Sequence, residues 1–165
     1  MKFHLATLDN LEEIATLFHS CWHISYAELL SEEVRKAMNL EESKALWRPS
    51  LANPEDKETV IGISDSKIVS VFRIGRAKDD AGLGHLFSLY VDPIASGKGF
   101  GRKSLTEAID RLSEQGFETI TLWVFEANSI ARNLYKGLGF EPTGETRVDE
   151  LWQELEIKML KRIIQ

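Results

Sequence analysis

Apolar residues recur at two spacings along this chain. Short runs of apolar and β-branched residues predict strands, and segments with apolar positions three or four residues apart predict helices. The expected strands cover residues 2–6, 60–63, 68–74, 86–91, 119–125, 141–147 and 152–160. The first expected helix begins after Asp9, and the others cover residues 32–38, 40–52, 101–115 and 129–137. This order of β-α-α-α-β-β-β-α-β-α-β-β, without a repeat or a linker, predicts one α/β domain over residues 1–165.

Residues that favour helix starts mark several of these boundaries. Asp9 followed by Glu12 forms the pattern of a capping box. Asn39 followed by Glu42 repeats that pattern, and Ser31 is a further N-cap candidate. These signals are local, so they predict where helices begin but not what the helices pack against.

The composition is that of a compact globular protein, with 43% hydrophobic and 28% charged residues. The single cysteine, Cys21, excludes an internal disulfide, and no apolar run approaches the ~20 residues that span a bilayer. The first residues lack the apolar core of a signal peptide. A pI of about 5.3 argues against general nucleic-acid binding. We therefore expect a cytoplasmic monomer or homodimer without a nucleic-acid or membrane partner.

The most informative segment is a glycine-rich loop between a strand and a helix, at residues 91–103. Gly97, Gly99 and Gly101 leave the backbone open to an anion, and the following helix points free amides at the same place. The segment also holds three cations, Lys98, Arg102 and Lys103. Its spacing matches neither a P-loop nor the G-x-G-x-x-G dinucleotide fingerprint. The segment predicts a phosphate site, and the alternative is an ordinary turn with solvated basic residues.

A second motif lies in residues 128–140, where the pattern N-x-x-A-x-x-x-Y-x-x-x-G-F is formed by Asn128, Ala131, Tyr135, Gly139 and Phe140. Together with the loop Ser96-Gly97-Lys98-Gly99-Phe100-Gly101, this motif resembles the GNAT superfamily of acyl-CoA-dependent N-acetyltransferases. The family loop reads Q/R-x-x-G-x-G/A, so Ser96 departs from it. A serine is too short for the phosphate contact of a glutamine or arginine, whereas the loop amides remain available.

The resemblance implies a fold and a co-substrate. The fold is a central mixed, mostly antiparallel sheet of about seven strands, splayed between strands 4 and 5, with helices on both faces. The co-substrate is acetyl-CoA, without a metal, and its pantetheine arm lies along the first splayed strand. The family often has a bulge in that strand, which frees an amide for the thioester carbonyl. The residues implied in binding acetyl-CoA are Leu89, Tyr90, Val91, Ser96, Gly97, Lys98, Gly99, Phe100, Gly101, Arg102, Lys103, Asn128 and Tyr135.

The resemblance also implies catalytic roles. Tyr135 is similar in position to the acid that protonates the departing CoA thiolate, and the alternative is a core aromatic with its hydroxyl at the rim. A base must take the proton of the attacking amine. Many relatives carry a glutamate on one of the splayed strands, but these two segments hold no acid here. Glu126 is the candidate base, with His85 and Asp92 as alternatives.

Two aromatic residues in the first half are candidates for acceptor binding. Trp22 and Tyr26 match the W-x-x-x-Y-x-x-L-L segment of one bacterial-type branch of the family. Family acceptor sites are commonly walled by the first two helices, but aromatic residues four positions apart also pack in cores. His19 and His23 share that spacing, and no third ligand accompanies them, so we expect no metal site.

These features predict transfer of an acetyl group from acetyl-CoA to a primary amine by direct attack in a ternary complex. The acceptor is a small-molecule or peptide amine that the sequence does not identify. A non-catalytic acyl-CoA-binding or sensing module is the alternative, favoured by Ser96 and by the missing strand carboxylate. A nucleotide-binding regulator is a third interpretation.

Overall fold

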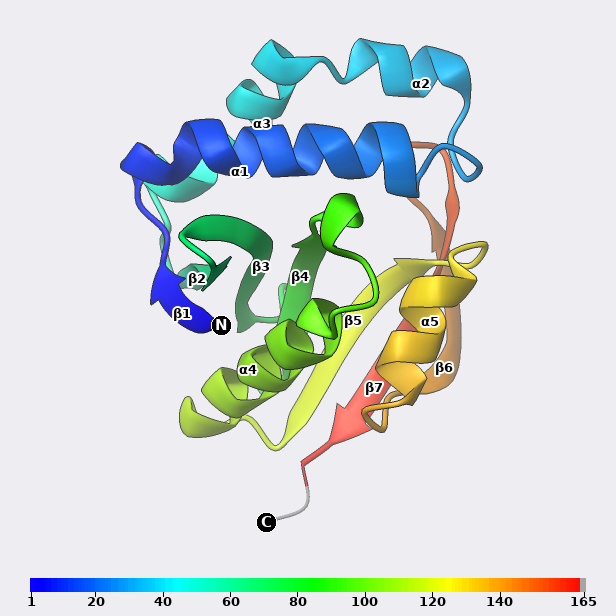
Figure 1. Cartoon of the computed structure of the whole chain (residues 1–165). Coiled ribbons are helices and arrows are strands. Elements are labelled where there is room, and N and C mark those ends of the chain that lie inside the picture. Colours follow the sequence, from blue (N-terminus) through cyan, green and yellow to red (C-terminus); the bar gives the residue numbers. More distant parts are fainter. Residues whose placement is uncertain (164–165) are drawn as a thin grey trace.

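A seven-stranded sheet with helices on both faces forms the body of the computed structural model, which describes residues 1–163 (Figure 1). The strands are β1 (Lys2–Leu5), β2 (Lys57–Ser64), β3 (Lys67–Arg76), β4 (Gly84–Val91), β5 (Thr119–Phe125), β6 (Glu141–Val148) and β7 (Leu155–Arg162). The α-helices are α1 (Leu11–Ser20), α2 (Glu32–Ala37), α3 (Leu40–Ala52), α4 (Phe100–Glu114) and α5 (Ser129–Lys136). Short helical turns cover Leu8–Asn10, Cys21–Ser25 and Pro93–Ala95. None of the helices in residues 1–163 has the length and apolar character needed to cross a membrane.

The strand order in the sheet is β1-β2-β3-β4-β5-β7-β6. Every neighbouring pair is antiparallel except β4 and β5, which are parallel. The parallel ladder is short, because only Gly84–Leu86 pairs with Ile120–Leu122. Beyond these residues the two strands diverge. The predicted mixed sheet, splayed between strands 4 and 5, is confirmed.

Strand β4 carries a bulge at the point where it leaves β5. On its β3 side, Arg73 pairs with Ser88 and the next residue, Ile74, pairs with Leu86. Phe87 is therefore an extra residue that has no partner in the ladder. A bulge of this kind bends the strand and re-aims its side chains. The bulge that the resemblance suggested is present, directly beside the splay.

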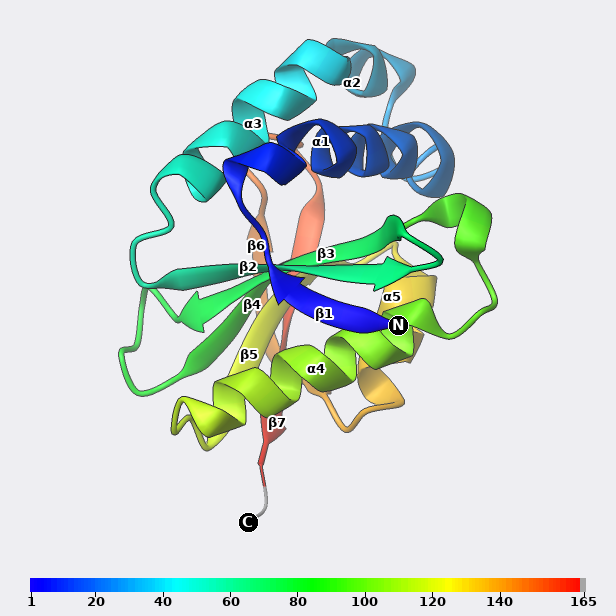
Figure 2. The same cartoon turned by 60° about the vertical axis from the view of Figure 1, so that its left-hand side comes forward.

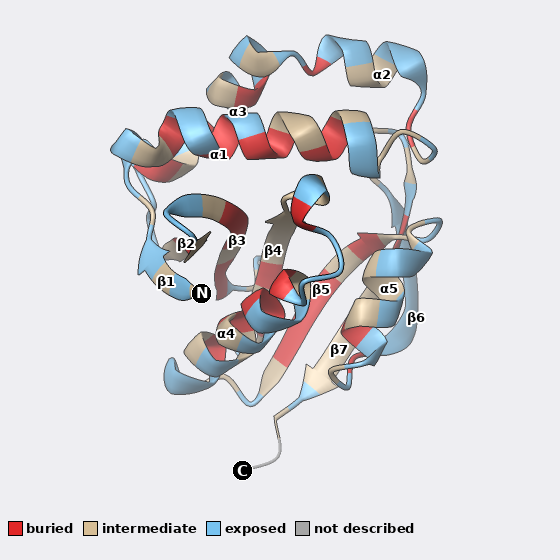
Figure 3. Cartoon of the chain, viewed as in Figure 1, coloured by how far each residue is buried: buried red, intermediate tan, exposed pale blue. Residues whose placement is uncertain are grey.

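Two apolar layers hold the helices on the sheet. Helices α1 to α3 lie on one side and α4 and α5 on the other (Figures 1 and 2). The α1 side is built on residues such as Phe18, Trp22 and Val71, and the α4 side on residues such as Phe72 and Leu105. Figure 3 shows that the buried residues of α1 and α4 follow one face of each helix, as amphipathic packing requires.

Two predicted boundaries are wrong for local reasons. Asp9 does not cap the first helix, because Thr7 and Asn10 pair across a 3-10 turn instead, with the Thr7 amide donating to Asn10 Oδ1 at 3.0 Å. The last strand starts at Leu155 rather than at 152. Residues 149–154 form a turn in which Asp149 Oδ1 accepts from the amide of Trp152 at 2.8 Å.

Other predicted helix starts are confirmed by their hydrogen bonds. Ser31 Oγ accepts from the amide of Val34 at 3.2 Å, and Asn39 Oδ1 accepts from the amide of Glu42 at 3.0 Å. Helix α4 begins at Phe100, one residue before the predicted start. The sequence therefore predicts an N-cap correctly where no other side chain nearby forms the capping hydrogen bonds instead.

Candidate functional site

The candidate site is a cleft at the point where β4 and β5 diverge, with a volume of about 190 Å³. The cleft is lined by the ends of both strands, by α5, by the turn after α1 and by the β6–β7 hairpin. Its lining residues include Trp22, Tyr26, Phe87, Ser88, Leu89, Tyr90, Trp123, Phe125, Asn128, Tyr135, Arg147, Asp149, Trp152 and Glu156. Segments from both ends of the chain thus meet at the splay.

A groove of about 350 Å³ adjoins the cleft on the side of α5. The groove runs along the end of β4, and its lining includes Leu89, Tyr90, Val91, Ser96, Asn128, Ala131, Leu134 and Tyr135. Leu89, Tyr90, Asn128 and Tyr135 line the cleft as well. The end of β4 has no strand neighbour on its β5 side, so its backbone groups on that side are available to an extended ligand.

The glycine loop forms an open cradle at one end of the groove. Gly97 and Gly99 have φ angles of 81° and 75°, and a Cβ built at either position meets no atom within 4 Å. The first amide to bond back in this helix is that of Lys103, which donates to the Gly99 carbonyl at 3.1 Å. The preceding amides, from Gly97 to Arg102, are thus free to bind an anion such as pyrophosphate.

Phe100 anchors this loop to the protein. Its side chain is 9% exposed and packs with Val69 and Ala95 in a small separate cluster. Phe100 therefore holds the loop in place through packing, while its backbone belongs to the anion cradle.

The three loop cations do not all lie together. Lys98 is exposed at the tip of the loop. Arg102 and Lys103 line a different surface cavity, which they share with Glu107 and Asp110. Ser96 lines the groove. The backbone of the loop, more than its side chains, is thus the anion-binding feature of this segment.

Asn128 and Tyr135 bring one face of α5 to the cleft. Asn128 Oδ1 accepts from the amide of Ala131 at 3.1 Å, so Asn128 caps the helix, and its side-chain NH₂ group remains for a ligand. Tyr135 is 7% exposed, and burial raises the pKa of its hydroxyl above the usual value. The hydroxyl is therefore protonated at neutral pH, as a proton donor must be.

The three sequence candidates for the base lie in different environments. Glu126 is exposed just after β5, and it lines neither the cleft nor the groove. Asp92 lines the groove, where its Oδ1 accepts from the amide of Ile94 at 3.0 Å. His85 lies beyond the cleft, on the paired part of β4. The structure does not bring these three side chains together.

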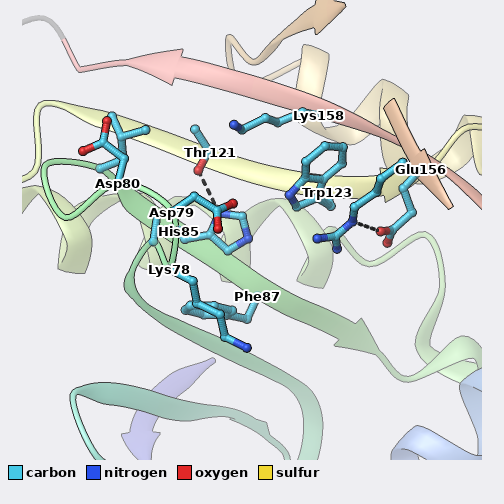
Figure 4. A pocket seen from close by; sticks show the side chains of 12 residues that line it. Lys78, Asp79, Asp80, His85, Phe87, Thr121, Trp123, Glu156 and Lys158 are labelled. Carbon is cyan, nitrogen blue, oxygen red and sulfur yellow. Dashed lines mark hydrogen bonds and ion pairs between the residues drawn. The ribbon is translucent and has the colours of Figure 1, made fainter. Parts of the chain in front are cut away.

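His85 lines a third cavity, the outer pocket, with a volume of about 210 Å³ (Figure 4). The outer pocket is formed by β4, β5, β7, the end of β6 and the β3–β4 loop, and its lining includes Lys78, Asp79, Asp80, His85, Phe87, Thr121, Trp123, Arg147, Glu156 and Lys158. Phe87, Trp123, Arg147 and Glu156 line the cleft too. The cleft therefore lies between the groove and the outer pocket and shares residues with both.

A hydrogen bond to β5 holds the His85 ring in place. His85 Nδ1 lies 2.7 Å from Thr121 Oγ1, and Thr121 Oγ1 lies 3.3 Å from the Gly84 carbonyl oxygen. Burial lowers the pKa of His85 to about 4, and the positive charges of Arg147 and Lys158 act in the same direction.

Four residues of the β6–β7 hairpin belong to the site but carry no sequence motif: Arg147, Asp149, Trp152 and Glu156. The local signal at Glu156 is weak, because Glu156 and Lys158 alternate with apolar residues, a pattern typical of an exposed strand face. Glu156 is 8% exposed, and Arg147 Nε lies 2.6 Å from its Oε2 atom. The alternation does not reveal that this carboxylate is buried at the cleft.

Trp22 and Tyr26 both line the cleft, in different ways. Trp22 is 1% exposed, and its ring centroid lies 5.5 Å from that of Phe18 and 4.2 Å from that of Trp152. Tyr26 is half-buried, and its ring lies 5.8 Å from that of Phe125. Trp22 thus forms part of the core behind the cleft wall, whereas Tyr26 forms the wall itself.

His19 on α1 and His23 in the turn after it stand apart from the cleft. The rings of His19 and His23 lie 4.2 Å apart, and His23 Nε2 is 3.2 Å from the Met38 carbonyl oxygen. Within residues 1–163 no group of three or more potential metal ligands occurs. Cys21 is buried, and its thiol donates to the Val91 carbonyl at 3.2 Å.

The fold and the cleft agree with the comparison of this chain with protein families. Residues 11–140 match the Acetyltransferase (GNAT) family, which is most of the chain. The chain therefore belongs to the GNAT acetyltransferase family. The match includes the glycine loop, the splayed strands and α5, and thus the segments that build the groove and much of the cleft, whereas the β6–β7 hairpin lies outside it.

Two relatives match shorter segments at higher identity. A mycothiol acetyltransferase of Beutenbergia cavernae is 41% identical over 38% of this chain and 21% of its own length. A [ribosomal protein bS18]-alanine N-acetyltransferase of Haemophilus ducreyi is 42% identical over 33% of this chain and 38% of its own length. The matched segment thus spans well under half of either relative.

Solved structures match over nearly the full chain. The PaiA N-acetyltransferase of Thermoplasma acidophilum, solved in complex with coenzyme A, has a TM-score of 0.77 at 21% identity and covers 98% of each chain. The ribosomal-protein-alanine N-acetyltransferase of Brucella melitensis has a TM-score of 0.74 at 19% identity and covers 99% of this chain and 100% of its own. These likenesses show the same fold.

Proposed function

We propose that this protein transfers an acetyl group from acetyl-CoA to a primary amine by direct attack in a ternary complex. The observation that carries the proposal is the central cleft, which shares lining residues with the groove and with the outer pocket. A donor in the groove and an acceptor in the outer pocket would meet at the cleft. Holding both reactants in one geometry removes much of the entropic barrier to their reaction.

The residues present fit acetyl-CoA. Bound there, it would supply an acetyl thioester. The amides of the loop from Gly97 to Gly101 would hold the pyrophosphate. Those backbone groups of Leu89, Tyr90 and Val91 that face away from β3 would hold the pantetheine arm. Ser96 and the Asn128 side chain lie along the same groove. Lys98, Arg102 and Lys103 add positive charge around the loop at longer range.

Two groups at the cleft serve the chemistry of the thioester. The extra residue of the β4 bulge, Phe87, is outside the ladder, so its amide can polarise the thioester carbonyl. Tyr135 lies on α5 at the junction of groove and cleft and donates its hydroxyl proton to the departing thiolate. The phenolate then recovers a proton from solvent.

The acceptor is a small-molecule or peptide amine, and Tyr26 and Trp22 form the aromatic side of its site. The names of the relatives refer to mycothiol and to an alanine of a ribosomal protein, so they do not agree on one acceptor. We infer a cytoplasmic enzyme, a monomer or a homodimer. The alternative, a binding module without turnover, would bind acetyl-CoA and release no CoA. Measuring CoA release with lysine, spermidine, phenethylamine and an alanine-initiated peptide separates the two.

Acetyl-CoA is expected to raise the melting temperature. A ligand at 100 times its dissociation constant stabilises the folded state by about 2.7 kcal/mol, which thermal unfolding by circular dichroism detects. ATP and NADH at the same concentration serve as controls and should shift the melting temperature far less. Equal shifts with ATP would favour a nucleotide-binding regulator, and no shift with acetyl-CoA would contradict a donor site in the groove.

Gly99→Asp is expected to weaken acetyl-CoA binding at least about 100-fold, because it places a carboxylate in the cradle for the pyrophosphate, where like charges repel. Titration calorimetry with acetyl-CoA measures the effect. Gly116→Asp is the matched control, since Gly116 also has a positive φ, of 91°, and open space at its Cβ, but lies at the other end of α4. Equal affinities in the two variants would show that the loop is only a turn.

A further inference from the structure

Glu156 occupies a distinctive place in the fold. It is the only ionisable carboxylate, and the only formally charged side chain, that is buried within residues 1–163. It lies on β7 opposite Phe125, the last residue of β5, and lines both the cleft and the outer pocket. Burying a carboxylate is costly unless it is paired, and a perturbed carboxylate at the junction of two cavities is a candidate for a role in binding or catalysis.

The partners of Glu156 leave one oxygen available. Arg147 lies opposite it on β6, with Arg147 Nε 2.6 Å from Oε2 and the guanidinium carbon 4.3 Å from the centre of the Trp123 ring. Within residues 1–163, no hydrogen bond to Oε1 is found. Arg147 therefore orients the carboxylate through one oxygen, and the other oxygen can accept an N–H of an acceptor (Figure 4).

The surroundings of Glu156 raise the pKa of its carboxyl group above the usual value. Burial raises the pKa of Glu156 and the negative charge of Asp149 acts in the same direction, whereas Arg147 lowers it. The titratable and charged groups that line the cavities with it are Arg147 and Asp149 from the hairpin, Lys158 from β7, His85 from β4, Lys78, Asp79 and Asp80 from the β3–β4 loop, and the hydroxyls of Tyr26, Tyr90 and Tyr135. A carboxylate with a raised pKa is a stronger base than an exposed one.

The other candidate bases are less suited to this position. Glu126 is exposed and outside the cleft. The Asp92 carboxylate caps the turn after β4 at the groove, on the donor side. His85 has a lowered pKa of about 4, so its imidazole ring is a weak proton acceptor.

We propose that the acceptor amine reaches the cleft through the outer pocket and gives its proton to Glu156, while Arg147 acts as a positioning residue for that carboxylate. The inference rests on the proposed acetyl transfer. An ammonium first transfers one proton to Glu156 Oε1, and the neutral nitrogen then forms the bond to the acetyl carbon as the carbon–sulfur bond breaks. Tyr135 protonates the sulfur, the second amine proton leaves to water, and Glu156 returns its proton to water.

The test is the pH dependence of kcat/KM for the amine of the panel with the highest turnover. In the unmodified protein, kcat/KM is level between the raised pKa of Glu156 and the pKa of the amine, ~10.4 for a lysine-like amine and ~8 for an α-amine. Glu156→Gln cannot accept the proton, so only the free neutral amine reacts. Its kcat/KM should be about 100-fold lower near pH 7 and rise about tenfold per pH unit towards the amine pKa.

Two further variants separate this role from a structural one. Glu141→Gln, an exposed change on β6 of the same hairpin, should leave the pH profile unchanged. Glu156→Asp retains the carboxylate and should retain the level profile at a lower rate. The melting temperature and its shift with acetyl-CoA, measured for each variant, show that the fold and the donor site are intact.

The outcomes are distinguishable. A level profile in Glu156→Gln, in protein that acetyl-CoA still stabilises, would overturn the inference and leave the proposed function standing. A sloping profile in Glu126→Gln together with a level one in Glu156→Gln would assign the base to Glu126. No turnover of any panel amine by the unmodified protein would overturn the proposed function and the inference together.

Discussion

Tyr135→Phe is expected to lower kcat by about 10²–10⁴, the range for a lost general acid. The variant removes only the hydroxyl, so the ring keeps its place 6.0 Å from the Phe140 ring in the core. CoA affinity should stay within a few-fold, because the groove is also formed by β4 and by the glycine loop. The release of free CoA thiol at saturating concentrations of both substrates measures kcat.

The departure of the thiolate gives a second measurement for this variant. A thiolate whose thiol is more acidic needs less help from an acid when it leaves. The loss of kcat in Tyr135→Phe should therefore be smaller with a donor that carries such a thiol. An unchanged kcat with acetyl-CoA, at an unchanged melting temperature, would instead assign Tyr135 to packing. The low exposure of this side chain, 7%, makes that alternative a concrete one.

Trp22→Ala is expected to cost about 3–5 kcal/mol of unfolding free energy, the range for removing a buried aromatic side chain. Trp22 is 1% exposed and lies against Phe18, Tyr26 and Trp152. For a chain of this size the loss corresponds to a fall in melting temperature of about 6–20 °C. Urea denaturation gives the free energy directly.

Trp152→Ala is the matched control, because its ring touches Trp22 from the half-buried rim of the cleft. It should cost clearly less stability than Trp22→Ala. If Trp22→Ala instead keeps its melting temperature and raises the acceptor KM, Trp22 binds the acceptor through its π face, as its place in the motif suggested. A large loss of stability with unchanged acceptor kinetics would leave Tyr26 as the aromatic contact.

Several parts of the fold followed from short-range patterns. Ser31 and Asn39 cap helices as predicted, because an N-cap bond joins residues three positions apart and depends on little else. The predicted strand start at residue 152 is wrong, because a local side-chain bond competes with the strand there. Leu151 and Trp152 resemble the start of an apolar strand, but the Asp149 side chain bonds their amides and holds them in a turn.

The site was predicted unevenly. Asn128 and Tyr135 both line the cleft, since the two residues are two helical turns apart on one face of α5. Glu126 is the sequence candidate for the base because it directly follows a splayed strand. A position in the sequence does not give the direction of the side chain. Glu156 had no motif, and its burial depends on pairing with β5 and β6, which no local pattern encodes.

The order of elements, the glycine loop and the family resemblance follow from short segments of the sequence, because each depends on residues close together in the chain. Gly97 and Gly99 adopt left-handed conformations that favour glycine, so their residue types imply the open loop. Which side chains meet at the splay depends on how distant segments pack. The ion pair of Arg147 and Glu156 belongs to the β6–β7 hairpin, but its place beside Trp123, the packing of Trp152 on Trp22 and the outer pocket all require β7 to pair with β5, which is a long-range arrangement of the sheet.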